Sequence, residues 1–526
     1  MTTRSRGPHV LAVDLGTGGP KVGLVSFRGT VAHRQQVAVA TRLLPGGGAV
    51  QDAGEWWEVI TAAARRALGS GSVPPEDVVA VSCTGQWAST VPVDEAGLPV
   101  GDCLLWLDSR GGPHSRRAVG GPVAGYNPGA AARWVRRSGG APSTSGADPI
   151  GHMLFIEHEQ PGVARRARWY LEPVDYLAMR FTGLAAASHA SMAGAWLTDN
   201  RDLGRMAYDP VLVASSGVPG EKLPPLRPTG SVVGEVSAEV ARSLGLGPGV
   251  RVITGTPDLH SAAAGSGSVL EYEAHLTIST TSWVSCPLDR KKTDPVHQIA
   301  TVPGLPPGPG ASAAYLVANN HETGGRCLEW LRDLLGAGPP GPVIGYDTLT
   351  AAAATVVPGS NGAIFTPWLA GERSPVDDRN ARGGFHNLSL RTTRAELVRS
   401  VLEGVAYNSR WLAEAVDRFV GRRLEPIRLV GGGATSSLWC QIHADVLDRP
   451  IERVAEPVDA NLRGAALLAG LALGHLDPGE LRSLVPIDGR FTPDPRAHRT
   501  YDHLYAEFPR LYSAQKPMFA RLNRPG

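Results

Sequence analysis

Residues 9–25 read His9-Val-Leu-Ala-Val-Asp14-Leu-Gly16-Thr17-Gly-Gly-Pro-Lys21-Val-Gly-Leu-Val25. An apolar run ends at an aspartate, and a second apolar run begins after the lysine. The Gly/Thr segment between them is typical of a tight turn, so this stretch predicts two strands joined as a hairpin. The turn gathers a carboxylate, a hydroxyl, an ammonium group and backbone N–H groups, the set that a magnesium-bound polyphosphate needs.

Two familiar glycine motifs do not fit this turn. A P-loop requires Gly-x-x-x-x-Gly-Lys-Ser/Thr, and residues 16–21 lack that spacing. A dinucleotide fingerprint requires a helix after its glycines, whereas Pro20 and the apolar run 22–25 favour a strand. A plain glycine-rich hairpin without a ligand is the alternative that these residues leave open.

A second segment reads Thr254-Gly-Thr-Pro-Asp258-Leu-His260-Ser-Ala-Ala. It follows a predicted buried strand over 250–255, and ligand crevices in α/β domains form at strand ends. A carboxylate at Asp258 could accept a proton from a substrate hydroxyl. The alternative is an ordinary helix cap, because aspartate is common at that position. A lone histidine such as His260 is more often a packing or surface residue, so it receives no role.

A third segment runs from Ile427 through Gly431-Gly-Gly-Ala-Thr-Ser-Ser437 to Gln441 and Asp445. It predicts a strand, three glycines and an amphipathic helix. Consecutive glycines allow a ligand to approach the backbone closely, and the helix start adds free N–H groups. A strand–helix turn with no ligand explains the glycines equally well.

The length, charge and cysteine content of the whole chain limit the fold and the partners that can be expected. Its 526 residues exceed the roughly 250–300 residues of one core, which predicts two large domains. A net charge of +2 gives no reason to expect nucleic acid or an anionic membrane as partner. Five scattered cysteines favour reduced thiols in a cytoplasm, and the N-terminus is a poor signal peptide. The sequence contains no uncharged apolar stretch of membrane-spanning length.

Several further elements are predicted from local patterns. Residues 55–68 read as a helix that follows Asp52, and residues 273–287 read as a second strand–turn–strand unit whose hydroxyl-rich turn echoes the first. Thr393-Arg-Ala-Glu396 is a capping box that opens a long helix with a stop at Gly421. The stretch before Tyr208 reads as helical, residues 121–150 read as an ordered irregular insertion, and the tail after about 490 reads as a packed helix.

Taken together and in this order, the segments resemble the FGGY carbohydrate kinases, the family of xylulokinase, gluconokinase and glycerol kinase. Three further stretches match family motifs: Val81-Ser-Cys-Thr-Gly85-Gln86-Trp87, Leu105-Trp106-Leu-Asp108-Ser-Arg110, and Phe365-Thr-Pro-Trp-Leu-Ala-Gly371-Glu372-Arg373-Ser-Pro375. The resemblance extends over about residues 9–475. Each motif alone is modest, and six in register are specific.

The resemblance implies an α/β fold with two ribonuclease-H-like domains of the actin/hexokinase type and a cleft between them. We divide the chain into an N-terminal domain of residues 1–266, on the sugar and phosphate side, and a C-terminal domain of residues 267–526, on the ATP side. The implied activity is ATP-dependent phosphorylation of a sugar or polyol hydroxyl in the cytoplasm, with ATP and Mg²⁺ as cofactors. Family members often form dimers or tetramers, so a homodimer is one expectation, although no stretch of sequence marks an interface.

By position in the family motifs, the resemblance also implies site residues. Asp14 would help to hold Mg²⁺, and Asp258 would be the general base. The phosphates would meet Gly16, Thr17 and Lys21 at the first turn and Thr280, Thr281 and Ser282 at the second. The adenosine would meet Gly432, Gly433, Ala434, Ser437 and Gln441. The sugar pocket would contain Gln86, Trp87, Trp106 and Asp108.

The sequence also departs from the family pattern. The first turn usually carries hydroxyl residues where this chain has Gly18, Gly19 and Pro20, and the second usually begins with Gly where Ser279 stands. Xylulokinases usually have Met-His after the Gln and Asn after the base, whereas this chain has Trp87-Ala88 and Leu259. These changes remove polar contacts and predict altered specificity, with an apolar wall at Trp87 suited to a shorter, deoxy or otherwise modified polyol.

Two alternatives from other classes remain at this stage. A non-catalytic sugar- or nucleotide-binding regulator on the same scaffold would explain the altered turn and pocket, but Asp14 and Asp258 are both retained. An actin- or Hsp70-like ATPase would share the fold, but the Gly-Glu-Arg-x-Pro and Trp-x-Asp-x-Arg matches belong to sugar kinases.

Overall fold

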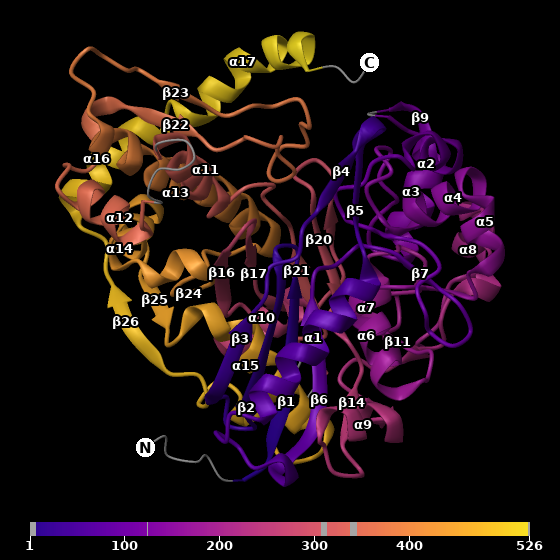
Figure 1. Ribbon diagram of the computed structural model, residues 1–526. Helices are drawn as coiled ribbons and strands as arrows, with labels where there is room; N and C mark the ends of the chain where they lie inside the picture. The colour runs from indigo at the N-terminus through magenta and orange to yellow at the C-terminus, as the bar shows by residue number, and fades with distance from the viewer. Residues whose placement is uncertain (1–6, 124, 307–312, 337–343, 524–526) are drawn as a thin grey trace.

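The computed structural model describes residues 7–123, 125–306, 313–336 and 344–523. Two mixed β-sheets form the centres of two α/β domains, and helices cover both (Figure 1). The N-terminal half of the chain occupies the centre and right of that view, and the orange and yellow C-terminal half occupies the left. A large cavity opens between the two halves. This arrangement confirms the predicted two-domain α/β fold with an interdomain cleft.

The N-terminal sheet is built around the predicted hairpin. Its strand order is β13 (Val232–Glu235), β14 (Arg251–Ile253), β6 (Val78–Gly85), β1 (His9–Gly16), β2 (Gly19–Ser26) and β3 (Val31–Gln36), with β15 (Thr256–Pro257) also beside β6. Strands β1 and β2 pair antiparallel from His9 opposite Ser26 to Gly16 opposite Gly19, which confirms the hairpin. Strands β6 and β1 run parallel, so Asp14 and Thr84 end at the same edge of the sheet.

Helices cover both faces of this sheet, which explains why β1 is an unbroken apolar run. Helix α1 (Ala53–Leu68) begins as predicted after Asp52, whose carboxylate accepts hydrogen bonds from Gly54 N and Glu55 N. Helix α6 (Pro173–Thr182) shares the core with α1, and α9 (Ala238–Leu244) lies nearby. On the opposite face, α15 (Ala460–Ala472) from the far end of the chain packs its alanines against β1 and β6.

The C-terminal sheet repeats the same plan. Its order is β17 (Ser282–Ser285), β16 (Ala274–Ile278), β24 (Ile427–Val430), β25 (Ile451–Val454) and β26 (Ile487–Phe491). Again an antiparallel hairpin, β16–β17, is followed by a parallel neighbour, β24. A smaller sheet extends the domain, in the order β18 (Pro287–Leu288), β21 (Tyr315–Ala318), β20 (Ile299–Pro303) and β19 (Thr293–Asp294).

One glycine stands at the same place in each sheet. A Cβ on Gly85, at the end of β6, would lie 2.4 Å from the carbonyl oxygen of Leu15 in the adjacent β1. A Cβ on Gly431, just after β24, would lie 2.5 Å from the carbonyl oxygen of Ile278 in the adjacent β16. Both glycines let two parallel strand ends converge beside a phosphate-type turn. This shared device supports the duplicated architecture that the two hairpins suggest.

The region between the sugar-side motifs and Asp258 is an insertion on the N-terminal domain. It contains α2 (Gly112–Val119), β9 (Gly120–Val123), α3 (Pro128–Arg137), α4 (Pro149–Glu159), α5 (Pro161–Arg166), α7 (His189–Ala193) and α8 (Pro210–Ser216). Short strands β4 (Arg42–Leu44), β5 (Gly48–Gln51), β7 (Val91–Val93), β8 (Cys103–Leu104), β10 (Trp169–Leu171), β11 (Ala187–Ser188) and β12 (Leu226–Arg227) complete the domain.

Two sequence predictions need correction in this insertion. Residues 121–150 are not irregular throughout, because α3 forms with Asn127 as its N-cap and fully buries the side chain of its own residue Trp134. The stretch before Tyr208 is not helical. It is an open loop that Asp209 ends by capping α8.

Helices α10 (Asp258–Ser266) and α15 join the two halves of the chain by backbone contact. A Cβ on Gly265 would lie 1.8 Å from Ala460 O, and one on Gly464 would lie 1.9 Å from Ser261 O. Only glycine allows this approach. Helix α15 also contributes to a cluster with Val430 and Val454 of the C-terminal sheet, so it belongs to the cores of both domains.

The remaining C-terminal helices wrap around the second sheet. Helix α13 (Arg394–Val420) has the predicted capping box at Thr393 and Glu396 and ends at Gly421. It packs with α11 (Arg326–Leu335), α12 (Tyr346–Ala354), α14 (Ser437–Leu447) and the strand β22 (Ile364–Thr366), which pairs with β23 (Gly384–His386). Helices α16 (Pro495–Tyr505) and α17 (Phe508–Leu522) bury Tyr501, Tyr505, Phe508 and Tyr512, which confirms a packed tail.

All five cysteines are buried with free thiols, in agreement with the reduced state expected from their spacing. Among the described residues, no helix combines the length and the apolar character needed to cross a bilayer.

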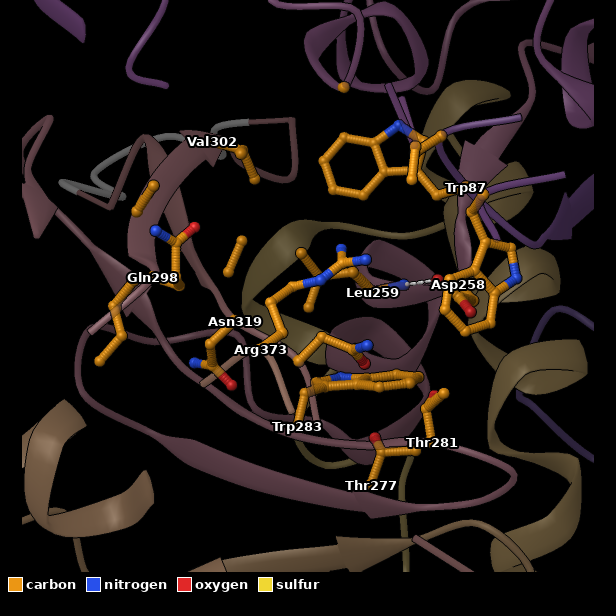
Figure 2. A pocket seen from close by; sticks show the side chains of 18 of the residues that line it. Trp87, Asp258, Leu259, Thr277, Thr281, Trp283, Gln298, Val302, Asn319 and Arg373 are labelled. Atoms are coloured by element: carbon orange, nitrogen blue, oxygen red, sulfur yellow. Dashed lines mark hydrogen bonds between the residues drawn. The ribbon is translucent and has the colours of Figure 1, made fainter. Parts of the chain in front are cut away.

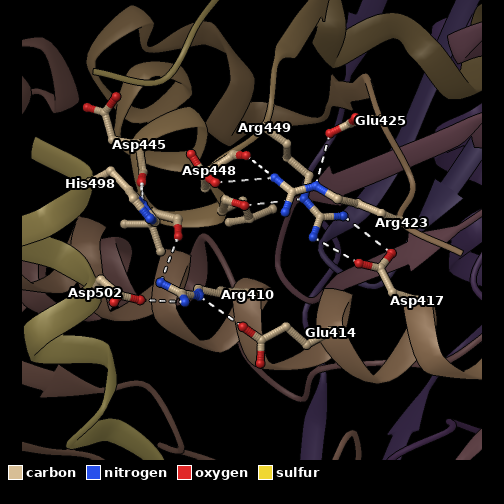
Figure 3. A network of polar contacts seen from close by, with 12 residues as sticks. Arg410, Glu414, Asp417, Arg423, Glu425, Asp445, Asp448, Arg449, His498 and Asp502 are labelled. Atoms are coloured by element: carbon tan, nitrogen blue, oxygen red, sulfur yellow. Dashed lines mark hydrogen bonds and ion pairs between the residues drawn. The ribbon is translucent and has the colours of Figure 1, made fainter. Parts of the chain in front are cut away.

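A polar network fastens the end of α13 to the strand and helix that follow it (Figure 3). Arg449 is 3 % exposed and contacts Asp417 through two nitrogens, at 2.9 and 3.3 Å. Asp417 also accepts a hydrogen bond from Leu424 N at 3.0 Å. Nearby, Arg410 reaches Asp502 at 2.7 Å, but Asp502 is 57 % exposed.

We expect Asp417→Ala to lower the free energy of unfolding by about 3 kcal/mol, because it leaves the Arg449 guanidinium buried without its carboxylate. Asp502→Ala, which breaks an exposed pair in the same network, should cost only about 0–1 kcal/mol. Chemical denaturation of both variants measures the difference. Equal losses would contradict this account of the network.

Candidate active site

The cavity between the domains has a volume of about 1240 Å³ and is lined by both of them. The N-terminal domain contributes the turn after β1, the ends of β6 and β15, and Trp106. The C-terminal domain contributes the turn between β16 and β17, the end of β24 and the segment that leads into α15. The sequence segments that first stood out therefore surround one space.

The first turn is held in shape by its glycines and by β3. Gly16, Thr17, Gly18 and Lys21 line the cavity. Gly19 has φ +122°, and a Cβ there would lie 2.1 Å from Val37 O, so no other residue fits without movement. Gly18 has open space around its Cα, which leaves its backbone free to face a ligand.

Asp14 lies at the end of β1, and little of its side chain is exposed. Lys21 Nζ donates to one carboxylate oxygen at 3.2 Å and to Val458 O at 3.3 Å. Asn461 Nδ2 donates to the other oxygen at 3.5 Å. The carboxylate is thus held by a cation and an amide, with one edge on the cavity.

Asp258 is the first residue of α10, and Pro257 occupies the N-cap position. The helix-cap interpretation of this aspartate is therefore wrong. Its carboxylate accepts a hydrogen bond from Leu259 N at 2.8 Å and lines the cavity. Burial, together with the negative charge of Asp14, raises the pKa of the Asp258 carboxyl from its usual value to about 7.

His260, two residues further along α10, is fully buried and does not line the cavity. Its Nε2 contacts Pro303 O at 2.7 Å, and burial lowers its pKa to about 4. It is a buried packing residue, as the sequence indicated.

The second turn presents three of its residues to the cavity. Ser279, Thr280 and Thr281 line it, and the backbone is anchored by Gly325 N on Ser279 O at 2.6 Å and Gly324 N on Thr280 O at 2.9 Å. Ser282 is fully buried behind the turn and does not line the cavity. Its hydroxyl has no hydrogen-bond partner among the described residues.

Of the five residues predicted to meet adenosine, Gly432 alone lines this cavity. Gly433 faces the Ile278 side chain, and Ala434 is buried. Ser437 accepts a hydrogen bond from Arg453 at 3.0 Å, and Gln441 donates to Asp445 and to Thr492 O. Gly432 is therefore the glycine of this predicted set that reaches the cavity, and it follows Gly431, which has φ +90°.

On the opposite side, Gln86, Trp87 and Trp106 line the cavity as predicted. Trp106 Nε1 donates to the Thr17 hydroxyl at 3.1 Å, and that hydroxyl donates to Gln86 Oε1 at 3.2 Å. The Thr17 hydroxyl thus links the first turn to the sugar-side residues.

Asp108 requires a correction. It is fully buried and does not line the cavity. Its carboxylate accepts bonds from Ala49 N at 2.9 Å, from Arg110 N at 3.1 Å and from the Arg110 guanidinium at 2.7 Å. In this fold Asp108 holds the loop that carries Trp106.

Several lining residues escaped the sequence reasoning. Arg373 extends into the cavity from a matched motif (Figure 2). Its Nε donates to a carboxylate oxygen of Glu322 at 3.0 Å. Its neighbour Glu372 is buried and accepts bonds from Glu322 N, Arg373 N and Asn408. The motif match is the one signal that could have singled out Arg373.

The insertion and α15 supply further lining residues that no sequence pattern marked. Tyr126 and Asp148 come from the insertion, and Asn461 comes from the start of α15. Asn461 contacts a carboxylate more than four hundred positions earlier, which only the tertiary fold brings about.

Comparison with known proteins agrees with this geometry. The model for the N-terminal domain of the FGGY family of carbohydrate kinases matches residues 9–265, and the model for its C-terminal domain matches residues 291–473. A xylulose kinase of Staphylococcus epidermidis is 27% identical over 98% of this chain and 98% of its own length. A gluconokinase of Bacillus licheniformis is 24% identical over 98% of this chain and 97% of its own.

A solved gluconate kinase from Lactobacillus acidophilus has the same fold, with a TM-score of 0.82 and 22% identity over 98% of this chain and all of its own. With both domain models matched in order over most of its length, the chain belongs to the FGGY family of carbohydrate kinases, which are phosphotransferases.

Proposed function

We propose that this chain transfers the γ-phosphoryl group of Mg–ATP to a hydroxyl of a sugar or polyol, with Asp258 as the general base. The observation that carries the proposal is the placement of Asp258 and Asp14 on one cavity together with two phosphate-type turns. Relatives named xylulose kinase and gluconokinase support an acceptor of sugar size. Five buried free thiols and dependence on ATP fit a cytoplasmic enzyme.

The donor side rests on backbone groups and few side chains. The turns at 16–18 and 279–281 both line the cavity, so backbone N–H groups from both domains would be available to phosphate oxygens there. Asp14 is the carboxylate that would hold Mg²⁺, because Mg²⁺ is usually bound by one or two carboxylates plus substrate phosphates and water. The described residues contain no cluster of three acidic, His or Cys ligands, which suits a metal that arrives with the nucleotide. Bound Mg²⁺ would neutralise charge on the phosphates.

The acceptor side depends on Asp258. A carboxyl with a pKa near 7 is a stronger base than an ordinary aspartate and is still ionised in about half of the molecules at neutral pH. It would orient the acceptor hydroxyl and take its proton as the bond to phosphorus forms. Phosphoryl transfer needs alignment and charge neutralisation more than covalent help, so one base and the two turns suffice.

The division of the chain at residue 266 remains our proposal for the domain boundary. It coincides with the end of α10, and the family models leave 266–290 between them.

The first experiment measures ADP release from Mg–ATP against a panel of ketoses, aldoses, sugar acids and short polyols. Release that depends on one panel member supports the kinase and names its substrate class. Intact ATP binding without release from any member would instead favour the non-catalytic regulator.

We expect Asp258→Asn to reduce kcat by about 10²–10⁴-fold, because it removes the proton acceptor and keeps the side-chain shape. Affinity for Mg–ATP should be retained. Asp202→Asn, an exposed aspartate outside the cavity, serves as the matched control. Near-normal turnover by Asp258→Asn would refute the assignment of the base.

The raised pKa of Asp258 predicts the pH dependence of the reaction. Protonation removes the base, so kcat/KM should fall about tenfold per pH unit below about 7 and level off above it. The pH profile of the wild-type enzyme measures this. A profile that stays flat down to pH 5 would contradict an active ionised Asp258 with this pKa.

Gly432 provides the test of nucleotide approach. No heavy atom lies within 4 Å of a Cβ built on it, so Gly432→Val should fold and yet place a side chain in the cavity. We expect the KM for ATP to rise about tenfold or more, equivalent to about 1.4 kcal/mol. Gly162→Val, equally open but on α5, is the control. An unchanged KM would place the nucleotide elsewhere.

A further inference from the structure

An apolar surface adjoins Asp258 in the cavity. Five residues form it, and we call them the apolar wall: Trp87, Leu259, Trp283, Val302 and Ala318. They line the cavity and belong to one cluster of apolar contacts. Trp87 and Leu259 come from the N-terminal domain, whereas the other three come from β17, β20 and β21 (Figure 2).

Trp87 presents its apolar ring to the cavity and not its indole N–H. Its Nε1 donates to Ser191 O at 2.6 Å, so the N–H is already bonded. Gly194 makes room for the indole, because a Cβ there would lie 2.9 Å from that nitrogen. The Trp87 and His260 rings make an edge contact with their centroids 6.2 Å apart, which fixes the orientation of the indole. The indole is therefore a rigid apolar surface beside the base.

Three of the amide side chains that line the cavity near the wall are also engaged. Asn319 accepts from Val284 N at 3.1 Å and donates to Val284 O at 2.6 Å, so both ends bind the β17 backbone. Gln298 donates to Pro295 O at 2.9 Å. Gln86 accepts from Thr17 and donates to Gln51. These amides support the cavity and leave little bonding capacity for substrate hydroxyls.

Near the wall, the terminal nitrogens of Arg373 have no hydrogen-bond partner among the described residues. They can donate to a substrate oxygen, but they cannot accept from a hydroxyl. The Trp283 indole N–H and the Thr277 hydroxyl also lack a partner, but both atoms are buried and closed to the cavity. A hydroxyl directed at Leu259 or Val302 would lose its water and gain no partner.

We propose that the acceptor site selects a deoxy carbohydrate, one in which a C–H or methyl group replaces a hydroxyl. The apolar wall receives the deoxy position, Asp258 receives the reacting hydroxyl, and Arg373 donates to a remaining oxygen. This inference rests on the proposed kinase activity and specifies its substrate class.

The test compares matched pairs of substrates in the ADP-release assay. Suitable pairs are D-xylulose with 1-deoxy-D-xylulose, L-tagatose with L-fuculose, and L-fructose with L-rhamnulose. We expect one deoxy member to exceed its hydroxylated partner in kcat/KM by about 10–200-fold, the range that one group against an apolar pocket supplies.

Leu259 provides the variant that assigns this preference to the wall. Leu259→Asn adds an amide of similar size, and the backbone N–H that bonds to Asp258 is kept. It should lower the deoxy-to-hydroxylated ratio at least about tenfold, while Leu259→Met, which stays apolar, should preserve the ratio. Mg–ATP affinity of each variant, measured by calorimetry, reports whether the fold is intact.

The outcomes distinguish a failure of the deoxy inference from a failure of the kinase proposal. A wild-type enzyme that prefers the hydroxylated member of every pair would overturn the deoxy inference and leave the kinase proposal standing. A ratio unchanged by Leu259→Asn, with nucleotide binding intact, would also overturn it. Absence of ADP release with every sugar would contradict the kinase proposal itself, and the deoxy inference with it.

Discussion

The backbone contact between α10 and α15 is the constraint on which the site depends. Gly265 and Gly464 let these helices touch without intervening side chains. Helix α10 carries Asp258 at its start, and the segment that opens α15 brings Val458 to Lys21 and Asn461 to Asp14. Any larger residue at either glycine would separate Asp258 from Asn461, which contacts the Asp14 carboxylate. A packing contact between domains thus sets a distance in the active site.

The duplicated sheets explain why the contact between α10 and α15 is enough to bring both hairpin turns to one cavity. Each sheet ends in a hairpin turn beside a parallel strand whose closing glycine, Gly85 or Gly431, lets the strand ends converge. Both turns therefore line the same cavity once the helices fix the relation between the sheets. In the proposed function, the pair would supply backbone N–H groups to a polyphosphate from both domains.

The parts of this protein that were predictable from sequence are those in which local residues decide the geometry. The hairpin at Asp14, the cap at Asp52 and the box at Thr393 each follow from neighbours in the chain, and the structure confirms them. Asp108 could not be placed in this way, because its burial depends on Ala49 N and on the fold of a distant strand. Asn461, Arg373 and the insertion residues Tyr126 and Asp148 also reach the cavity through tertiary packing that no spacing along the chain reveals.

Exclusion of water around Asp258 can govern both the pKa of its carboxyl and the choice of substrate. Burial is the larger cause of the raised pKa of Asp258, with the charge of Asp14 second. Leu259 is covalently adjacent to this carboxyl, and Trp87 stands on the same side of the cavity. Replacing polar groups there with apolar ones withdraws water from the carboxyl and strengthens it as a base. The same replacement withdraws partners from substrate hydroxyls, so a gain in basicity and a narrowing of the acceptor range arise from one change in composition.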